Sequence, residues 1–312
     1  MKMLKKINRK KEILYSVTLI LVPLVLFFSA IFLLNPNQTE TVVNDLQEQF
    51  VTPKNYFFDN INILARSAIV KDLNTGEIIY EKNSDIQLPL ASITKVLTAL
   101  TFEITSNAEY VQISSEDLLE YGDNFLSLGE RFRRNDLINF MLLTSSNDSA
   151  AALASNSFGS YRSTSNDFVE KMNQVAKTAN MNNSYFSNPT GLDKDANTAG
   201  AHGTARDVAN LFEYTIKNYP HIMDQTKNES LKIISLNGYV HNIRNTNQSV
   251  GVLPNILASK TGFTDLAGGN LAVVIDPALN RPIVIVVLGS TNDGRFDDVK
   301  ILSEKTIEYL KL

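Results

Sequence analysis

Ser92 and Lys95 form a pair whose residue types and spacing could do nucleophilic chemistry. Pro89 holds the residue before it in an extended conformation, and the apolar positions after Ala91 predict a helix, so Ser92 falls in the first helical turn. Lys95 then projects from the same face, within reach of the Ser92 hydroxyl. Such a serine can act as a nucleophile with the lysine amine as its base. A helix-capping serine and a solvated lysine explain the same pair more simply.

Two further polar motifs follow this pair along the chain. Ser145 and Asn147 lie in the short stretch between an apolar helix and an alanine-rich one, where a helix N-cap would use the same residue types. Lys260, Thr261 and Gly262 end a strand pattern, where an edge-strand lysine and a bulge glycine are the ordinary interpretation. Ser-x-x-Lys, Ser-x-Asn and Lys-Thr-Gly therefore occur in this order, 53 and 115 residues apart.

The elements that must position these motifs are strands at both ends of the region and helices in its middle. A glycine-containing turn at 74–76 predicts a β-hairpin, and Thr204 with Asp207 resembles a capping box at a helix start. The order predicts a sheet split by a helical insertion at about 101–227, hence two lobes with a ligand cleft between them. The expected strands are 65–72, 77–82, 231–236, 256–261, 269–275 and 282–289. One expected helix begins at residue 91, and the others cover 134–143, 146–155, 165–179, 205–217 and 297–312.

The N-terminal segment predicts a membrane anchor. Six cations and one anion occupy residues 1–12, and the next 22 residues, 13–34, carry no charge, whereas roughly 20 apolar residues span a bilayer. The positive-inside rule keeps 1–12 in the cytoplasm and places a stalk at 35–60 and a domain at 61–312 outside, in a single-pass protein of the cell membrane. A cleaved signal peptide is the competing interpretation, but the apolar run is longer than a typical h-region and no Ala-x-Ala site follows.

Composition excludes several classes of function. The 312 residues, 44% of them hydrophobic, allow a substantial core, and the absence of cysteine excludes disulfides and thiol catalysis. The three histidines are isolated from one another, which argues against a zinc site, so no metal or cofactor is expected. Beyond residue 12 the formal charge is −9, from 23 cations and 32 anions, so non-specific nucleic-acid binding is not expected.

Taken together, the motifs resemble those of the serine DD-peptidases, the superfamily of penicillin-binding proteins and serine β-lactamases. The likeness covers about 65–312 and is most detailed for the low-molecular-mass D-alanyl-D-alanine carboxypeptidases. It implies an α/β two-lobed fold in which an antiparallel sheet is flanked by helices and a mainly helical lobe is inserted. The segments that carry the likeness are Ala68–Asp72, Gly76–Tyr80, Pro89–Lys95, Ser145–Asp148, Asn188–Leu192, Thr204–Asp207 and Lys260–Gly268.

The resemblance implies a role for each motif residue. Ser92 would attack a D-Ala-D-Ala peptide and form an acyl-enzyme, Lys95 would accept the serine proton, and Ser145 would relay a proton to the leaving D-Ala. Burial and the like charge of Lys260 would lower the pKa of Lys95. Asn147 would hold an amide of the substrate, and Lys260 would keep the site positively charged. Thr261 and Arg295 would bind the terminal carboxylate of the substrate. The Gly262–Phe263 strand would border the substrate, and the Phe263 N–H would form an oxyanion hole with the Ser92 N–H.

The implied function is a serine-type D-Ala-D-Ala carboxypeptidase that trims peptidoglycan stem peptides and is acylated by β-lactam antibiotics. Three alternatives would use the same residues. A class A β-lactamase requires a glutamate in a Glu-x-x-Leu-Asn context, and Glu170–Asn173 has a different spacing and no leucine. A penicillin-binding sensor that does not turn over requires a signalling domain, for which twelve cytoplasmic residues are too few. A DD-endopeptidase that acts on cross-linked peptidoglycan is not distinguished by sequence.

Overall fold

The computed structural model describes residues 57–122, 125–157 and 165–311. They belong to one compact unit that begins at Phe57. The expected cytoplasmic segment, membrane helix and most of the stalk fall in residues 1–56, outside the described part of the chain. Among the described helices, none is both long and apolar enough to cross a membrane.

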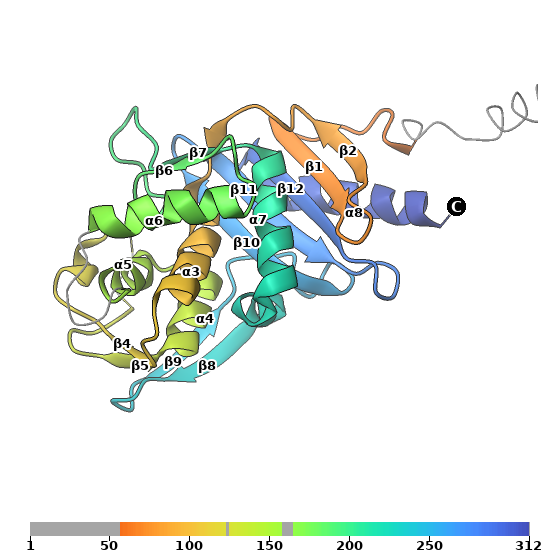
Figure 1. Ribbon diagram of the computed structural model, residues 1–312. Coiled ribbons are helices and arrows are strands. Elements are labelled where there is room, and N and C mark those ends of the chain that lie inside the picture. Colours follow the sequence, from red (N-terminus) through yellow and green to blue (C-terminus); the bar gives the residue numbers. More distant parts are fainter. Residues whose placement is uncertain (1–56, 123–124, 158–164, 312) are drawn as a thin grey trace, which may run out of the picture. The chain divides into compact units, whose positions relative to one another are not determined.

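A five-stranded antiparallel sheet organises this unit (Figure 1). The central strands are almost entirely buried because hydrophobic residues occupy both of their faces. Two strands from the N-terminal end of the domain thus complete a sheet whose other three strands come from its C-terminal end, as the sequence pattern predicts. The strand order is β10 (Ile256–Thr264), β11 (Gly268–Ile275), β12 (Ile283–Ser290), β1 (Ser67–Asp72) and β2 (Ile78–Lys82).

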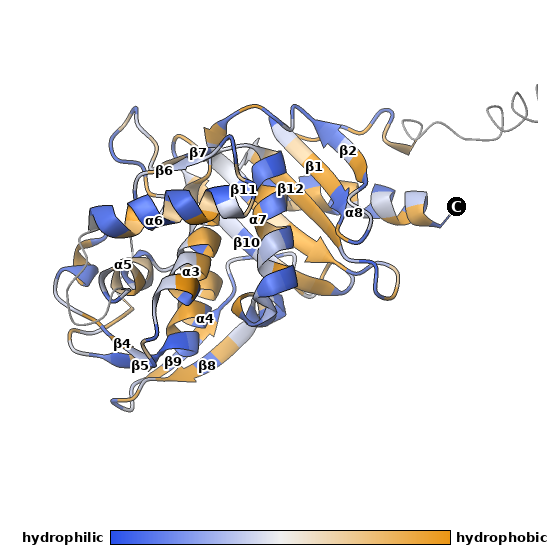
Figure 2. Cartoon of the chain, viewed as in Figure 1, coloured by the Kyte–Doolittle hydropathy of each residue, from blue (hydrophilic) through white to orange (hydrophobic). Residues whose placement is uncertain are grey.

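Helices cover both faces of the sheet. Successive strand residues point to opposite faces, so Ile285 packs in one hydrophobic cluster with α8 (Gly294–Leu310). Val286 packs in the other cluster with α7 (Ala205–Asn218) and α3 (Thr94–Thr105). Figure 2 shows the hydrophobic strands β1, β11 and β12 behind α7, whose outward side is hydrophilic. This three-layer arrangement confirms the predicted fold class.

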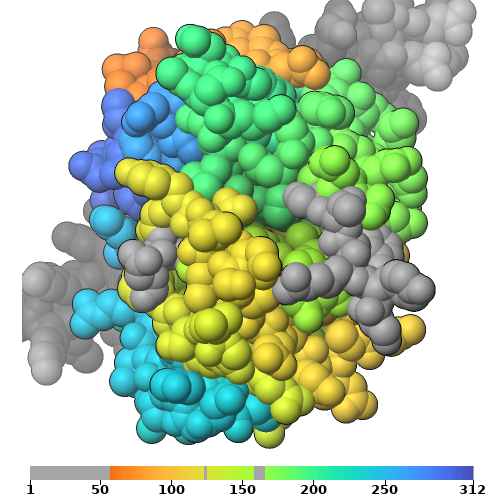
Figure 3. All heavy atoms as spheres, turned by 90° about the vertical axis from the view of Figure 1, so that its left-hand side faces the viewer, coloured from red at the N-terminus to blue at the C-terminus, as the bar shows by residue number. Residues whose placement is uncertain are grey.

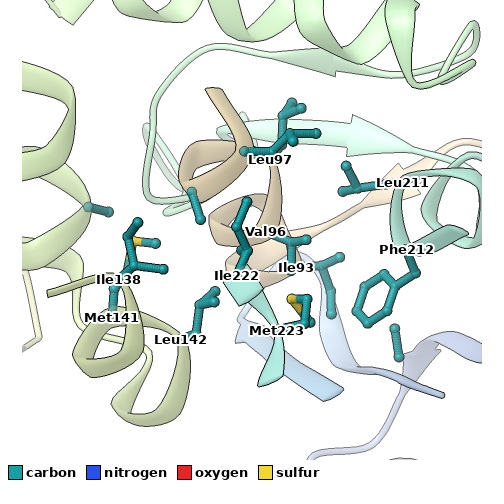
Figure 4. Packing of buried hydrophobic residues seen from close by; sticks show 14 of the residues in the cluster. Ile93, Val96, Leu97, Ile138, Met141, Leu142, Leu211, Phe212, Ile222 and Met223 are labelled. Atoms are coloured by element: carbon teal, nitrogen blue, oxygen red, sulfur yellow. The ribbon is translucent and has the colours of Figure 1, made fainter. Parts of the chain in front are cut away.

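The helix α3 connects the sheet to the helical lobe and is buried along most of its length. It contacts α4 (Arg134–Thr144), α5 (Asn147–Ser155) and α6 (Ser165–Thr178) in the lobe and α7 on the sheet side. Figure 4 shows Val96 and Leu97 of α3 among residues from these neighbours, including Met141, Leu142, Leu211 and Phe212. A helix surrounded in this way is a rigid support for any residue at its N-terminal end.

The helix α7 begins where its capping sequence predicts. The Thr204 hydroxyl accepts a hydrogen bond from the Asp207 N–H at 3.0 Å. The Asp207 carboxylate accepts from the Asn183 N–H and the Ser184 hydroxyl, which ties a preceding loop to the helix. Although α7 falls within the predicted insertion at 101–227, it packs against β1 and β12 of the sheet.

The compact unit starts a few residues before the predicted domain boundary at 61. The Phe58 ring stacks on Tyr80 with ring centroids 5.1 Å apart, and the Phe57 ring meets the edge of Tyr309 at 5.7 Å. Aromatic pairs of this kind stabilise a fold beyond the apolar area that they bury. Phe57 and Phe58, which the sequence assigns to the stalk, therefore pack onto the sheet and α8.

Several short elements carry no periodic signal, and all of them except β8 are absent from the sequence-based expectation. Strands of two or three residues are too short to show an alternating pattern. The pair β8–β9 is a hairpin of which only the first strand was expected. The short elements are β3 (Leu88–Pro89), β4 (Tyr110–Gln112), β5 (Arg131–Arg133), β6 (Tyr185–Phe186), β7 (Ala201–Gly203), β8 (Ser230–Ile234), β9 (Val240–Arg244), and the 3₁₀ turns η2 (Ala91–Ile93), η3 (Asp117–Leu119), η4 (Pro220–Ile222) and η5 (Asp224–Lys227).

Candidate active site

The backbone segment just before Ser92 is hydrogen-bonded to neighbouring elements on both sides. The strand β3 pairs with β7, and the Leu90 N–H donates to the Ala201 carbonyl at 3.0 Å. From the sheet, the buried Asn270 Nδ2 donates to the Pro89 carbonyl at 2.9 Å. Ser92 therefore follows a backbone segment that is anchored to two different sheets.

Ser92 itself lies in the 3₁₀ turn η2, and the α-helix begins two residues later at Thr94. We expected the α-helix to begin at Ala91, but Ala91 has a positive φ of 48°, which an α-helix does not accommodate. No side-chain capping bond is made at the start of η2 or of α3. Ser92 is thus not a helix-capping serine.

Two glycines allow other segments to approach this turn closely. A Cβ atom on Gly191 would lie 2.0 Å from the Ala91 carbonyl oxygen, and one on Gly262 would lie 3.2 Å from the Ser92 nitrogen. The loop that contains Gly191 and the strand β10 that contains Gly262 therefore both reach the Ser92 backbone without an intervening side chain.

We predict that Gly191→Ala destabilises the protein and disturbs the Ser92 turn. Gly191 has a φ of +77°, so alanine there costs about 1–2 kcal/mol from backbone conformation alone. The clash with Ala91 adds about 1–3 kcal/mol of overpacking. Thermal unfolding and the rate of covalent penicillin labelling would measure the two effects.

Gly76→Ala is the matched control for this prediction. Gly76 has the same φ of +77°, but a Cβ atom there would meet nothing within 4 Å, so this variant bears only the conformational cost. An equal loss of stability and unchanged labelling in both variants would show that the approach of Gly191 to Ala91 is unimportant.

The Lys95 side chain is fully buried and its amine contacts three oxygen atoms. Its Nζ lies 2.9 Å from Ser92 Oγ, 2.7 Å from Asn147 Oδ1 and 2.7 Å from the Thr190 carbonyl oxygen. This geometry places the amine within proton-transfer distance of the Ser92 hydroxyl. A solvated lysine is excluded.

The second motif lies at the junction of α4 and α5. Ser145 ends α4 with a left-handed φ of 64°, and the Ser146 hydroxyl caps α5 by accepting from the Ser149 N–H at 3.0 Å. Asn147 is therefore the first residue of α5, although the sequence placed it in a loop. Its Nδ2 donates to the Tyr121 carbonyl at 2.7 Å, so its Oδ1 is oriented toward Lys95.

The Lys260 side chain is also buried, and it joins the third motif to the second. Its Nζ lies 2.9 Å from Ser145 Oγ and 2.8 Å from the Thr261 carbonyl oxygen. Burial, with smaller contributions from the positive charges of Lys95 and Arg295, holds the pKa of Lys260 well below its ordinary value. The two buried amines therefore favour a state in which they do not both carry a proton.

The remaining site residues lie along β10 and at the start of α8. Thr261 is buried, and its hydroxyl lies 2.6 Å from the Thr246 hydroxyl. The Phe263 side chain is about half exposed, at 48%. Arg295 is 7% exposed, and its Nη1 donates to the Gly262 carbonyl at 2.8 Å. The structure thus places Arg295 against the strand that carries Thr261 and Phe263.

Three further residues contribute to the site without a recognised sequence signal. Thr190 and Tyr121 act through backbone carbonyl groups, on Lys95 and Asn147 respectively. Thr246 contacts Thr261, and its N–H donates to the Leu143 carbonyl at 2.9 Å. The sequence did indicate a turn at Asn188–Gly191, which contains Thr190, and the family resemblance includes this segment, but neither points to the Thr190 carbonyl as a contact of Lys95.

The segment that presents the Tyr121 carbonyl is held by a buried pair. The Glu130 carboxylate is fully buried, with one oxygen 2.6 Å from His241 Nε2 and the other accepting from the Ser127 N–H at 3.0 Å. The Leu236 N–H donates to the Arg131 carbonyl at 2.7 Å. Figure 3 shows the yellow segments around residues 113–122 and 125–130 above the cyan β8–β9 hairpin. The β8–β9 hairpin therefore supports the segment that presents the Tyr121 carbonyl to Asn147.

In the described part of the chain, no group of three histidine, aspartate or glutamate residues is placed to hold a metal ion. The chemistry that this arrangement can perform is nucleophilic attack by Ser92 with Lys95 as proton acceptor.

The sequence matches the model of a known family and several characterised relatives. Residues 52–292 match the family Peptidase_S11, described as D-alanyl-D-alanine carboxypeptidase. The chain is 33% identical over 235 residues to a D-alanyl-D-alanine endopeptidase of Escherichia coli K12, which covers 72% of this chain and 71% of that protein. It is 27% identical over 243 residues to the D-alanyl-D-alanine carboxypeptidase DacF of Bacillus subtilis, covering 74% of this chain and 59% of that protein.

Solved structures share the fold. A D-alanyl-D-alanine carboxypeptidase from Mycobacterium tuberculosis superposes with a TM-score of 0.71 at 25% identity, covering 80% of this chain and 92% of that chain. Penicillin-binding protein D2 from Listeria monocytogenes, in its ampicillin-bound form, superposes with a TM-score of 0.67 at 27% identity, covering 79% of this chain and 98% of that chain.

Proposed function

The chain belongs to the D-alanyl-D-alanine carboxypeptidase family of serine peptidases, and we propose that it removes the terminal D-Ala of peptidoglycan stem peptides through an acyl-enzyme on Ser92. The observation that carries the proposal is the buried Lys95 amine, which lies between Ser92 Oγ and Asn147 Oδ1. The activity of the family supports the reaction, and the geometry supports the residues that perform it.

In the acylation step, Ser92 Oγ forms a bond to the carbonyl carbon of the penultimate D-Ala. The hydroxyl proton passes to Lys95 Nζ, 2.9 Å away, which requires the amine to be neutral at that moment. Burial and the like charges of the two amines disfavour a second proton on the pair, and in the reactive state the single proton is on Lys260. The negative charge that develops on the substrate oxygen is stabilised by the N–H groups of Ser92 and Phe263.

The bond to the terminal D-Ala then breaks, and its nitrogen takes up a proton. The Ser145 hydroxyl gives this proton, and Lys260, at 2.9 Å, replaces it because a lowered pKa makes the Lys260 ammonium release a proton more readily. Transfer of the Lys95 proton back to Lys260 leaves the Lys95 amine neutral again. Water then attacks the ester and passes a proton to Lys95, which gives it to Ser92 Oγ as the ester bond breaks. Release of the shortened peptide restores Ser92.

We predict that Thr261→Val weakens binding of peptides with a free terminal carboxylate. The change removes a hydroxyl but keeps the side-chain volume, and a hydrogen bond to a charged group contributes about 1.5–3 kcal/mol. KM should rise about tenfold or more for diacetyl-Lys-D-Ala-D-Ala while kcat changes less. Steady-state kinetics of D-Ala release would measure both constants.

Thr264→Val is the control, since Thr264 lies on the same strand but donates to Asp193 at 3.0 Å. A C-terminally amidated peptide supplies the second control, because it lacks the carboxylate. An equal loss on the amidated peptide would contradict the assigned role of Thr261.

The proposed function is tested by incubating the protein with diacetyl-Lys-D-Ala-D-Ala and measuring free D-Ala. We expect catalytic release of one D-Ala per peptide and no release of L-Ala from the L-Ala-L-Ala isomer. A protein that becomes acylated once by the peptide without releasing further D-Ala would overturn the proposal and favour a sensor.

A D-alanyl-D-alanine endopeptidase is the second candidate, because the Escherichia coli relative that shares 33% identity bears this name. Both reactions use the same acyl-enzyme and differ in whether the leaving group is D-Ala or a cross-linked peptide. Digestion of purified cross-linked muropeptides distinguishes them. Cleavage of the cross-link without release of terminal D-Ala from monomeric peptides would assign the endopeptidase.

The family also supports β-lactam antibiotics as covalent ligands of the site. The Listeria relative was solved with ampicillin bound. A β-lactam would acylate Ser92 in the same way as the peptide, and its ring would remain attached as the leaving group. Fluorescent penicillin therefore serves as a probe of the proposed nucleophile.

We further propose that residues 13–34 anchor the enzyme in the cell membrane with the catalytic domain on the extracytoplasmic side. Support comes from the uncharged run of 22 residues after a basic segment. The full chain should stay with membranes during alkaline extraction. A variant with Leu21→Arg and Leu26→Arg should lose this retention, since each arginine near the bilayer centre costs about 2.5–3.5 kcal/mol. Equal retention of both proteins would contradict the anchor.

A further inference from the structure

Arg295 is buried at the start of α8, behind the strand that borders Ser92. Its Nη1 donates to the Gly262 carbonyl at 2.8 Å, and its guanidinium lies 4.8 Å from the centre of the Phe296 ring. Burial lowers the pKa of Arg295 to about 10, so the side chain is still a cation at neutral pH. A charged donor in a buried position makes a stronger hydrogen bond than a neutral one.

The direction of the neighbouring backbone groups follows from strand geometry. The Thr261 carbonyl accepts from Lys260 Nζ, which also contacts Ser145, so the backbone groups of Thr261 face the site. Backbone groups alternate in direction along an antiparallel strand, so those of Phe263 face the site as well. The Gly262 carbonyl therefore points away from the site, toward Arg295.

The Gly262 carbonyl and the Phe263 N–H belong to the same planar peptide unit. Arg295 holds one end of this unit, and the other end is directed toward the Ser92 turn. The strand β10 lies close to that turn, because a Cβ atom added to Gly262 would lie only 3.2 Å from the Ser92 nitrogen. A cation at the carbonyl end withdraws electron density from the peptide and makes its N–H a better donor.

We propose that Arg295 is a positioning residue for the oxyanion hole: it orients and polarises the Gly262–Phe263 peptide so that the Phe263 N–H stabilises the tetrahedral intermediate. The inference rests on the proposed function, because it requires acylation of Ser92. It differs from a role in binding the substrate carboxylate, since it predicts an effect on the reacting carbonyl whether or not a carboxylate is present.

The experiment compares Arg295→Gln and Arg295→Lys with the wild type on two peptides, diacetyl-Lys-D-Ala-D-Ala and its C-terminal amide. We expect Arg295→Gln to lower kcat about tenfold on both, less than the 10²–10³ typical for loss of a whole oxyanion donor. KM should change little, and Arg295→Lys should recover part of kcat because it keeps the charge. Arg134→Gln, which removes a partly buried arginine paired with Glu103, is the control for loss of a cation elsewhere.

Infrared difference spectra of the penicillin acyl-enzyme give a readout that a structural role would not move. A weaker Phe263 donor should shift the ester carbonyl stretch of Arg295→Gln to higher frequency, while the Arg134→Gln spectrum stays at the wild-type position. If Arg295→Gln does not fold, the same shift, smaller in size, is expected in Arg295→Lys.

Two results would overturn the inference. One is a loss confined to the carboxylate-bearing peptide, mainly in KM, which would make Arg295 a carboxylate ligand. The other is an unchanged carbonyl frequency in a folded Arg295 variant. Failure of the wild-type protein to form any acyl-enzyme would instead count against the proposed function.

Discussion

Replacement of Ser92 by alanine should abolish covalent labelling by fluorescent penicillin and reduce D-Ala release by about 10⁵-fold or more, the scale seen when a nucleophilic serine is removed from a hydrolase. The reason is that Ser92 Oγ forms the acyl bond, and no other hydroxyl is proposed to do so. The fold should be retained, because Ser92 makes no capping bond to a helix. Gel fluorescence and peptide hydrolysis would measure the two losses.

Ser146→Ala is the matched control for the nucleophile. Its hydroxyl caps α5, so its loss should cost about 0.5–2 kcal/mol of stability while labelling continues. Labelling that persisted in Ser92→Ala would assign the nucleophile to a different residue.

Lys95→Met should slow acylation by about 10²–10⁴, the usual contribution of a general base. Methionine preserves the length and volume of the buried side chain but removes the amine that contacts Ser92 Oγ. Asn147 Oδ1 and the Thr190 carbonyl also lose a donor, so a moderate decrease in stability is expected. Stopped-flow kinetics with a chromogenic penicillin would give the acylation rate, and thermal unfolding would give the stability.

Lys71→Met is the control that distinguishes loss of the catalytic base from the general effect of replacing a lysine by methionine. Lys71 on β1 forms an ion pair with Glu213 on α7, with Nζ and Oε2 2.6 Å apart. This ion pair lies on the face of the sheet opposite α8. Its removal should leave the acylation rate unchanged. Near-normal acylation in Lys95→Met would remove Lys95 as the base.

Much of the fold could be predicted because its longer elements have strong periodic patterns. The hairpin β1–β2, the helices α4 to α7 and the strands β11 and β12 occur within a few residues of the expected ranges. The sequence could not give the end of β10, expected at Thr261 and observed at Thr264, because Phe263 and Thr264 are extended by pairing with Gly269 and Gly268. Tertiary pairing of this kind has no local signal.

The order of the three motifs predicted that they would lie close together in the fold. In the structure the Lys95 amine lies at hydrogen-bond distance from the Ser92 hydroxyl, and the Lys260 amine lies at hydrogen-bond distance from the Ser145 hydroxyl. Their catalytic roles stay predictions until the variants are measured. The contributions of Thr190 and Tyr121 could not be predicted, since a backbone carbonyl is available at every residue type.

Arg295 shows what the structure adds to a motif. The family resemblance implies a ligand for the substrate carboxylate, which stays a prediction, and the structure adds a hydrogen bond from the guanidinium to the Gly262 carbonyl. A motif identifies a residue type and its place in the chain, but not which of several nearby polar groups its side chain contacts.

The most direct test of the central claim is mass spectrometry of the protein after a rapid acid quench with penicillin, followed by peptide mapping. We predict one adduct with the mass of the intact penicillin, located on the peptide that contains Ser92 and absent from Ser92→Ala. An adduct on another residue, such as Ser145, or D-Ala release by a protein that never carries an adduct, would contradict a Ser92 acyl-enzyme.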